Sequence, residues 1–213
     1  MAFSLLDLPV LLLLCLSCSA QQAEKNCGPP PRMEIEELAE TQVKQFYSHN
    51  DVVQYNCRPG YIKLGRIKYQ CNNGEWKKTF PPVECRKKPC GHPGDAQFGT
   101  FELTVGEDFS YGSRVEYRCD DGYQMLSHTN YRICQVDGWS NDVPHCEVRK
   151  CFPVKAPVNG RMVMTGIDDP NQEFLFGQVV RFECNEDLKI EGPDQIFCTD
   201  KGEWSGVVPK CVG

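Results

Sequence analysis

A short alternation of apolar and polar positions recurs three times along the chain. Val53-x-Tyr55-x-Cys57, Val115-x-Tyr117-x-Cys119 and Val180-x-Phe182-x-Cys184 each place a branched residue, an aromatic residue and a cysteine at every second position. Because successive side chains of a strand point to opposite faces, this period of two predicts a half-buried β-strand. The cysteine shares the face of the two apolar residues, so each of the three strands should carry a disulfide on its buried side.

A second strand is predicted to end at the next cysteine of each copy. Ile67-x-Tyr69-x-Cys71 and Ile196-x-Cys198 repeat the alternation, and in the second copy Arg132 stands at the matching position. The arginine lies in a strand beside Cys134, which favours a structural role for it. The sequence thus predicts a pair of strands in each copy.

Turns are predicted where glycine and proline interrupt the alternation. Pro59-Gly60-Tyr61 and Asp121-Gly122-Tyr123 favour a turn between the two strands. The third copy has Asp187-Leu188 at this point, so we expect its turn to differ. Asp168-Asp169-Pro170-Asn171 predicts a further turn or loop in the third copy.

The segment before the first strand gives weaker signals. The chain enters as Cys27-Gly28-Pro29-Pro30-Pro31, and proline fixes φ and removes a hydrogen-bond donor, so we expect an irregular extended segment. The stretch from Met33 to Lys44 has a weak helical pattern, but a helix of this length is marginal without packing. We therefore expect a loop or a strand there.

Four cysteines per copy define a repeat whose units begin every 63 and 61 residues. This period exceeds that of the short repeats that stack into solenoids, so each copy should be a small domain of its own. The predicted order is a polar lead-in at 21–26, units at 27–85, 90–146 and 151–211, linkers at 86–89 and 147–150, and a tail at 212–213.

Each unit has one tryptophan between its third and fourth cysteines: Trp76, Trp139 and Trp204. A ligand-stacking role is the alternative, but very small domains need large apolar side chains to form a core. We interpret the three tryptophans as core residues packed against the disulfides.

The first 20 residues have the features of a secretory signal peptide. An apolar run from Val10 to Leu16 precedes Cys18-Ser19-Ala20, whose small residues suit cleavage after Ala20. The run is too short to span a bilayer. We therefore expect a secreted, extracellular protein with no membrane span.

Cysteine usage agrees with export. Removal of Cys15 and Cys18 with the signal leaves 12 of the 14 cysteines, or three sets of four, which predicts disulfides in an oxidising compartment. Zinc is the alternative, but the only Cys-x-x-Cys pair is Cys15/Cys18, and the four histidines form no ligand pattern. We expect no metal; four cysteines per unit leave three connectivities open.

The sequence contains no catalytic motif. It lacks a Gly-x-Ser-x-Gly elbow, a His-Glu-x-x-His motif and a phosphate loop. The many carboxylates are scattered through loops and predict no paired acid and base. We expect neither an enzyme nor a bound cofactor, and no nucleic-acid partner.

Charge is distributed unevenly over the units. The first carries eight Lys or Arg and seven Asp or Glu, whereas the second carries three and nine, and the third six and ten. Such asymmetry would orient the chain on a partner of opposite pattern, with a strength that salt reduces over a Debye length of about 8 Å. Arg86, Lys87 and Lys88 of the first linker are predicted to contact a partner protein; a solvated linker and a sulfated-glycan site are the alternatives.

The repeated marks resemble those of complement control protein modules, also called sushi modules. These marks are four cysteines per 60 or so residues, Gly-Tyr after the second, a glycine and a tryptophan before the fourth, and the closing Pro144-His145-Cys146 and Pro209-Lys210-Cys211. The resemblance covers residues 27–211 and implies an all-β fold of three tandem small disulfide-rich modules in an elongated string. It also implies first-to-third and second-to-fourth pairing, giving Cys27/Cys71, Cys57/Cys85, Cys90/Cys134, Cys119/Cys146, Cys151/Cys198 and Cys184/Cys211.

Within the family, several stretches resemble the first three modules of a secreted regulator of the alternative pathway of complement. They are RKKPCGHPGDAQFGTF, CDDGYQM, NYRICQVDGWSNDVPHCEV and FGQVVRFEC. The resemblance implies binding to the opsonic fragment of the third complement component, faster decay of the convertase, and presentation of the opsonin to the protease factor I. The alternative is an opsonin- or glycan-binding module that lacks regulatory activity and antagonises the regulator.

The resemblance also suggests contact residues. Arg58 stands where that regulator carries an arginine tied to opsonin binding; the alternative is an exposed turn residue of little consequence. Asp95 and Tyr123 are further candidates for contacts near the opsonin and the protease. Because the regulator builds its site from four modules, we expect three modules to bind more weakly than a chain extended by one.

Overall fold

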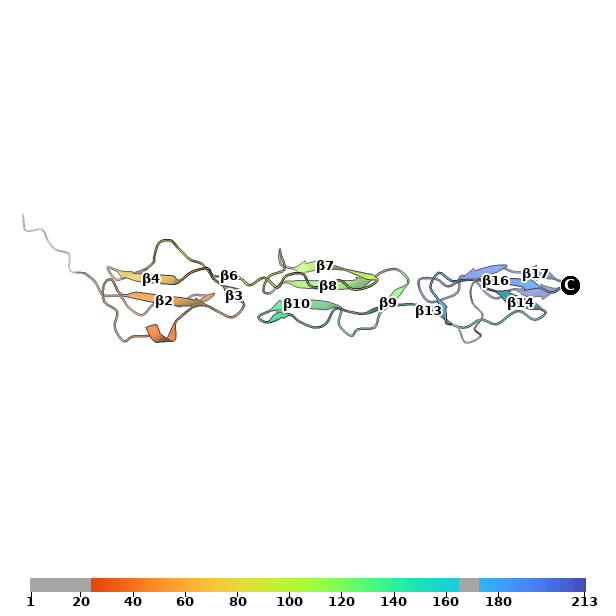
Figure 1. Cartoon of the computed structure of the whole chain (residues 1–213), viewed down its shortest axis with the longest axis horizontal. Coiled ribbons are helices and arrows are strands. Elements are labelled where there is room, and N and C mark those ends of the chain that lie inside the picture. The colour runs from red at the N-terminus through yellow and green to blue at the C-terminus, as the bar shows by residue number, and fades with distance from the viewer. Residues whose placement is uncertain (1–23, 165–172) are drawn as a thin grey trace, which may run out of the picture. The chain divides into compact units, whose positions relative to one another are not determined.

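The computed structural model describes residues 24–164 and 173–213, which form two compact units (Figure 1). We call residues 27–85, 90–146 and 151–211 modules one, two and three. The first unit ends at Arg86 and contains module one; the second begins at Lys87 and contains modules two and three. The expected signal peptide at 1–20 and the turn predicted at Asp168 to Asn171 lie outside the described residues.

Module one is built on a four-stranded antiparallel sheet in the order β1-β2-β4-β5. Its strands are β1 (Glu36–Leu38), β2 (Val52–Cys57), β4 (Ile67–Asn72) and β5 (Glu75–Lys78), with the short strand β3 (Tyr61–Ile62). The short strand β6 (Arg86–Lys87) lies in the linker that follows. A single 3-10 turn, Glu40–Gln42, follows β1. The stretch from Met33 to Lys44 therefore contains a strand and a tight turn, in agreement with the prediction that no α-helix forms there.

Module two has a four-stranded antiparallel sheet in the order β11-β10-β8-β7 and a separate pair, β9 with β12. The strands are β7 (Gly99–Val105), β8 (Arg114–Cys119), β9 (Tyr123–Met125), β10 (Tyr131–Gln135), β11 (Gly138–Trp139) and β12 (Cys146–Val148). The main sheet covers the core, and the small pair carries the chain toward module three.

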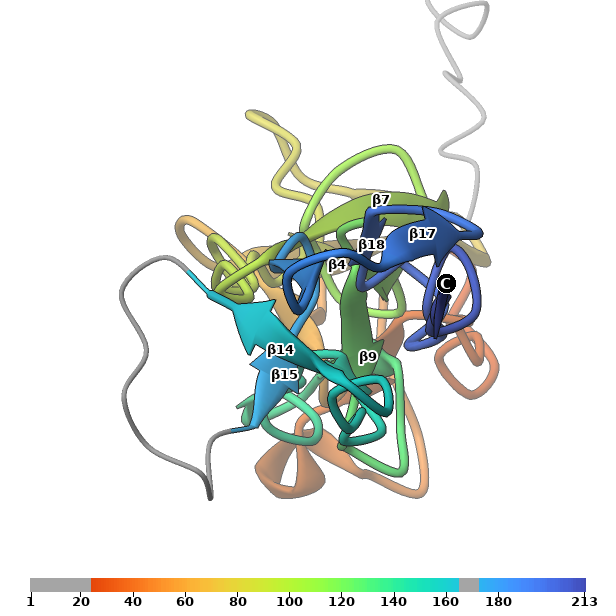
Figure 2. The ribbon, with the colours of Figure 1, turned by 90° about the vertical axis from the view of Figure 1, so that its right-hand side faces the viewer.

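Module three has a three-stranded antiparallel sheet in the order β14-β16-β18 and two small pairs, β13 with β15 and β17 with β19. The strands are β13 (Lys150–Cys151), β14 (Gly160–Val163), β15 (Phe174–Leu175), β16 (Val179–Cys184), β17 (Lys189–Glu191), β18 (Gln195–Phe197) and β19 (Lys210–Val212). Figure 2 shows β17 beside the C-terminus, where it pairs with β19.

The strand predicted three times is β2 in module one, β8 in module two and β16 in module three. Its valine is fully buried and its aromatic residue is 1 % exposed in every module. In module one the valine of β2 lies opposite Tyr69 and the tyrosine lies opposite Ile67 of β4. The predicted alternation and the all-β fold class are confirmed.

The buried tyrosine of this strand also anchors the irregular entry segment. In module one the Tyr55 hydroxyl donates to the carbonyl of Pro31 (2.6 Å), and in module two the Tyr117 hydroxyl donates to the carbonyl of Pro93 (3.0 Å). Burial raises the pKa of Tyr55 to about 12, so the hydroxyl remains a donor at physiological pH. Module three has Phe182 here, which buries the same ring without this bond.

Two disulfides close each module. The structure joins the first cysteine to the third and the second to the fourth in all three modules, with Cα–Cα distances of 5.6 to 5.9 Å. These distances are ordinary for disulfides. The third cysteines, Cys71, Cys134 and Cys198, are the most deeply buried, with at most 1 % of their surface exposed. The pairs are the ones that the family resemblance implied.

Each tryptophan lies opposite the buried third cysteine of its module. Trp76 pairs with Cys71 and Trp139 with Cys134 across neighbouring strands, and Trp204 forms a bridge with Cys198. The indoles are half-buried, because each N–H reaches a backbone carbonyl near the first cysteine: that of Gly28, Gly91 or Phe152, at 2.8 to 3.0 Å. The tryptophans thus pack against the disulfides, as predicted, and also hold the entry of the chain.

The turn of module three does not differ from the other two, so that expectation is wrong. Gly60, Gly122 and Asp187 all have positive φ, at 87°, 81° and 71°. In each turn the following N–H donates to the carbonyl three residues earlier, at 3.0 to 3.2 Å. Asp is one of the few non-glycine residues that tolerates this left-handed conformation, because its short polar side chain bonds locally.

We expect peptide mapping under non-reducing conditions to recover the six bridges within modules. The reason is that each pair already has ordinary disulfide geometry within a module. Digestion followed by mass spectrometry would identify the linked peptides, with a reduced sample as the control. Any peptide linking two modules would contradict the pairing.

We expect Asp187→Gly to stabilise module three by about 1 kcal/mol, because glycine adopts positive φ without the steric cost that a Cβ imposes. Asp187→Ala is the matched control: it keeps the Cβ and loses the polar group, so it should not stabilise. Calorimetric unfolding with intact disulfides measures both. A lower unfolding temperature for the glycine variant than for the parent would contradict this expectation. It would mean that the aspartate side chain stabilises the turn by more than the steric cost of its Cβ.

Candidate partner-binding surface

Arg58 follows β2 and is tied to the segment that precedes β1. Its backbone N–H donates to the carbonyl of Ile35 (3.0 Å), and its guanidinium Nη2 donates to the carbonyl of Met33 (3.2 Å). The side chain remains exposed. The guanidinium is thus held in place at the surface, with its remaining N–H groups available to a partner.

Arg58 lines a groove of about 440 Å³ in module one. The other walls include the proline run Pro29 to Pro31, Leu38 of β1 and the segment that carries Val43 and Tyr47. The groove is therefore lined by apolar residues together with charged ones, since Arg32, Glu37 and Lys44 line it as well as Arg58.

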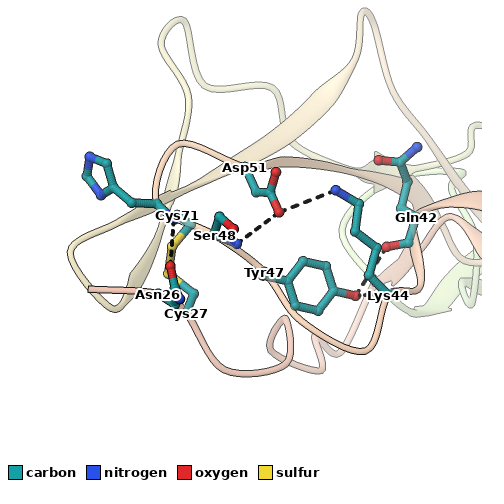
Figure 3. Close-up of polar contacts among 9 residues, drawn as sticks. Asn26, Cys27, Gln42, Lys44, Tyr47, Ser48, Asp51 and Cys71 are labelled. Atoms are coloured by element: carbon teal, nitrogen blue, oxygen red, sulfur yellow. Dashed lines mark hydrogen bonds and ion pairs between the residues drawn. A yellow bond between two sulfur atoms is a disulfide. The ribbon is translucent and has the colours of Figure 1, made fainter. Parts of the chain in front are cut away.

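The loop that carries Lys44 and Tyr47, which line this groove, is fixed by its own polar contacts (Figure 3). Asp51 Oδ2 accepts from the Ser48 N–H (3.0 Å) and from Lys44 Nζ (3.3 Å). These two contacts, the first larger, hold the pKa of Asp51 below its usual value. The Tyr47 hydroxyl accepts from the Lys44 N–H and donates to the carbonyl of Gln42. The charge of Lys44 is therefore matched within the module.

A second internal ion pair lies under the sheet of module one. Glu36 is buried, and its carboxylate accepts from Lys78 Nζ (3.0 Å) and from the Tyr69 hydroxyl (3.1 Å). Burial alone would lower the pKa of Lys78, but the hydrogen bond and the negative charge of Glu36 raise it overall. Sequence reasoning missed this cluster, because nothing in the pattern marked Glu36 as facing inward.

The first linker is not a free segment. Arg86 and Lys87 form β6 with exposed side chains. Lys88 is held on module two: its Nζ donates to the carbonyl of Val136 (2.7 Å), and its own carbonyl accepts from the Tyr111 N–H (2.9 Å). All three cations are exposed, and Lys88 differs from Arg86 and Lys87 in that a backbone carbonyl holds its ammonium.

Asp95 lies on the surface of module two beside His92, with 3.8 Å between its Oδ1 and the histidine Nε2. The histidine ring packs edge-on against Phe101 and Phe109 of the same module. The carboxylate itself is 83 % exposed. Asp95 therefore belongs to the rim of a small aromatic cluster and not to the acidic turn near Tyr123.

Tyr123 begins β9 and stacks on Phe98, with ring centroids 4.5 Å apart and an interplanar angle of 14°. The two rings line a groove of about 440 Å³ whose other wall includes Phe176 of module three. Phe176 also lies directly on Gly122, where a Cβ would come within 2.0 Å of its ring. The Phe176 N–H donates to the carbonyl of Arg149, whose own N–H donates to Gly122 (2.9 and 2.8 Å).

Comparison with known proteins decides the family. The model of the sushi repeat (SCR repeat) matches residues 27–85, 90–146 and 151–211. The chain belongs to the sushi repeat family.

Several curated relatives contain runs of sushi repeats similar to this chain. Complement factor H of Mus musculus is 50 % identical over 201 residues, and complement factor H of Bos taurus is 46 % identical over 203 residues. These alignments cover 94 % and 95 % of this chain but 16 % of each relative. The C4b-binding protein alpha chain of Homo sapiens is 32 % identical over 85 % of this chain and 30 % of its own length. The chain thus spans less than a third of the length of each of these relatives.

Arg132 has a structural role in the second sushi module, as its position in a strand predicted. Its Nε donates to the carbonyls of Ser140 (3.0 Å) and Asn141 (3.1 Å), and its Nη1 donates to the carbonyl of Pro93. The side chain therefore links β10 to the loop after β11 and to the entry of the module.

The candidate contact residues lie on different sushi modules, and of those in the second unit Asp95 and Tyr123 have separate surroundings. Arg58 lies on the proline groove of the first sushi module, Asp95 beside His92, and Tyr123 at the junction of the second and third modules. In the parts of the chain that the structure describes, no three His, Cys, Asp or Glu side chains are arranged to hold a metal, and no helix is long and apolar enough to cross a membrane.

Proposed function

We propose that this chain is a secreted complement regulator that binds the opsonic fragment of the third complement component. The observation that carries the proposal is its 50 % identity to murine complement factor H over 94 % of its length, a range that includes all three sushi modules. Six disulfides in three small modules support an extracellular site of action, because such bridges persist in oxidising compartments.

In this proposal the chain acts by binding and positioning. It holds the opsonin in an orientation that the protease factor I can cleave, and it accelerates the decay of the alternative-pathway convertase. Modules of about 60 residues are too small to enclose a deep pocket, so recognition falls to surface residues on successive modules. The partner contacts that we propose are Arg58, Arg86, Lys87 and Lys88 toward the opsonin, and Asp95 and Tyr123 near the opsonin and the protease.

The charge distribution supports a directed encounter. Cations in excess on the first module and its linker, and anions in excess on the other two, favour one orientation on a partner of complementary pattern. Arg58 is already positioned by its bond to Met33, so it loses little conformational freedom on binding. The pair of buried Glu36 and half-buried Lys78 contributes little here, because each neutralises the other.

A second candidate function is opsonin or glycan binding without regulation, which would antagonise factor H. The exposed cations Arg86 and Lys87 are the observation that favours it, since sulfated glycans are recognised by such groups.

Mixing the chain with the opsonic fragment and factor I separates the two functions. We expect the opsonin to be cleaved in the presence of the chain, because the chain orients it for the protease, and electrophoresis of the reaction measures the cleavage. The reduced and alkylated chain is the control and should support none. Binding without cleavage would favour the antagonist, and absence of binding would exclude both.

We expect the triple variant Arg58→Ala, Lys87→Ala, Lys88→Ala to associate with the opsonin about tenfold more slowly at low salt, with a smaller change in the dissociation rate. Steering by exposed charge acts on encounter, so the difference should shrink as salt increases. A matched triple change of Lys155, Lys189 and Lys210 in module three removes the same charge elsewhere. Equal association rates for the parent and the first variant at low salt would rule out steering by these cations; surface plasmon resonance measures all three.

A further inference from the structure

Two loops of module one each present a large apolar side chain almost entirely to solvent. Leu64, between β3 and β4, is 90 % exposed, and Phe80, between β5 and β6, is 93 % exposed. Single exposed apolar residues are common and need no explanation. Apolar residues gathered on neighbouring loops are different, since contiguous apolar surface marks interaction sites.

The two loops touch and are held in place. A Cβ built on Gly65 of the first loop would lie 3.3 Å from Val83 of the second. The second loop begins where the Thr79 N–H donates to the carbonyl of Lys68 (2.9 Å) and ends at Cys85, which is bonded to Cys57. We call these loops, residues 63–66 and 79–84, the apolar tip. Because both loops are fixed, their ordering costs little when a partner binds.

The other modules show that the fold does not require an aromatic residue at this tip. The segment from Trp76 to Cys85 is two residues longer than the corresponding segments 139–146 and 204–211. The shorter segments still close the same second-to-fourth disulfide. Seven residues after the second cysteine, module one has Leu64 and module two has Leu126, which is 50 % exposed, whereas module three has the charged Glu191. The exposed aromatic ring of Phe80, in a longer loop than the other modules have, is therefore not needed to close the module.

Cations border the tip. Lys63 Nζ donates to the carbonyl of Tyr55 (2.7 Å) and to Asn56 Oδ1 (3.0 Å), so its charge is fixed at the base of the first loop. Arg66 is exposed and forms no ion pair with the described residues, and Arg86 follows Cys85 with its side chain in solvent. Against these three cations, Glu84 is the only carboxylate in the two loops.

We infer that the apolar tip is a docking site for a protein surface that offers an apolar recess bordered by carboxylates. Anchors of this kind, surrounded by a polar rim, are the usual centres of binding energy at protein interfaces. Resting on the proposed function, the inference places this recess on the opsonic fragment of the third complement component. The tip would then contribute the apolar part of an interface whose charged part includes Arg58.

A membrane is the other surface that could attract apolar and cationic loops. The structure favours a protein for two reasons. The ammonium of Lys63 is tied to the module and is not free to follow lipid phosphates, and Glu84 would face the same anionic surface.

Leu64→Ser and Phe80→Ser test the tip by surface plasmon resonance on immobilised opsonic fragment. We expect each to weaken binding about tenfold, mainly through faster dissociation, because each removes an anchor from the centre of the contact. Phe152→Ser is the matched control: Phe152 is 85 % exposed, but it lies in module three, where no partner contact is proposed. The control should change affinity less than twofold, and unchanged thermal midpoints would show that all variants fold.

The outcomes separate this inference from the proposed function. If the parent binds and the tip variants bind equally well, the tip is not the docking site, while the proposed function stands. If the parent does not bind at all, the proposed function fails, and so does the placement of the recess on the opsonin. Sedimentation with vesicles of phosphatidylserine and phosphatidylcholine covers the membrane: parent binding that Phe80→Ser abolishes would overturn the docking of a protein.

Discussion

The structure depends on the pair of disulfides that closes each module. A unit of about 60 residues buries only about 60 % of its unfolded surface, so a core alone would be marginal. The period of two in β2, β8 and β16 brings a buried valine, a buried aromatic ring and a cysteine to one face. The third cysteine lies opposite the tryptophan, and the tryptophan holds the entry segment. With stability concentrated in these few contacts, the loops are free to vary.

The charged residues of the chain fall into two groups: those paired within a module and those available to a partner. Glu36 with Lys78, and Lys44 with Asp51, form ion pairs within module one. Arg58 and Arg66, by contrast, keep exposed guanidinium groups. A net charge counted over a module therefore overstates what a partner meets, because part of it is already matched. The cations available to a partner are therefore those, such as Arg58 and Arg66, that are not paired with a carboxylate among the described residues.

A left-handed backbone conformation occurs in module three although glycine, the residue that usually adopts it, is absent there. Asp187 takes the left-handed conformation of Gly60 and Gly122, and the same hydrogen bond closes all three turns. The sequence suggested a different turn because glycine was missing. The fold requires a positive φ at this position, and an aspartate meets that requirement at some steric cost.

The sequence by itself determined the repeat, the three pairs of strands, the family and the core residues, because these follow from local periodicity and from cysteine spacing that recurs in every copy. Only the tertiary structure shows which residues from distant parts of the chain come into contact and which side chains remain exposed. The burial of Glu36, the anchoring of Lys88, the contact of Phe176 with Gly122 and the exposure of Leu64 and Phe80 could not be read from the chain. Each of these depends on backbone from a distant part of the sequence, and no local pattern records such a neighbour.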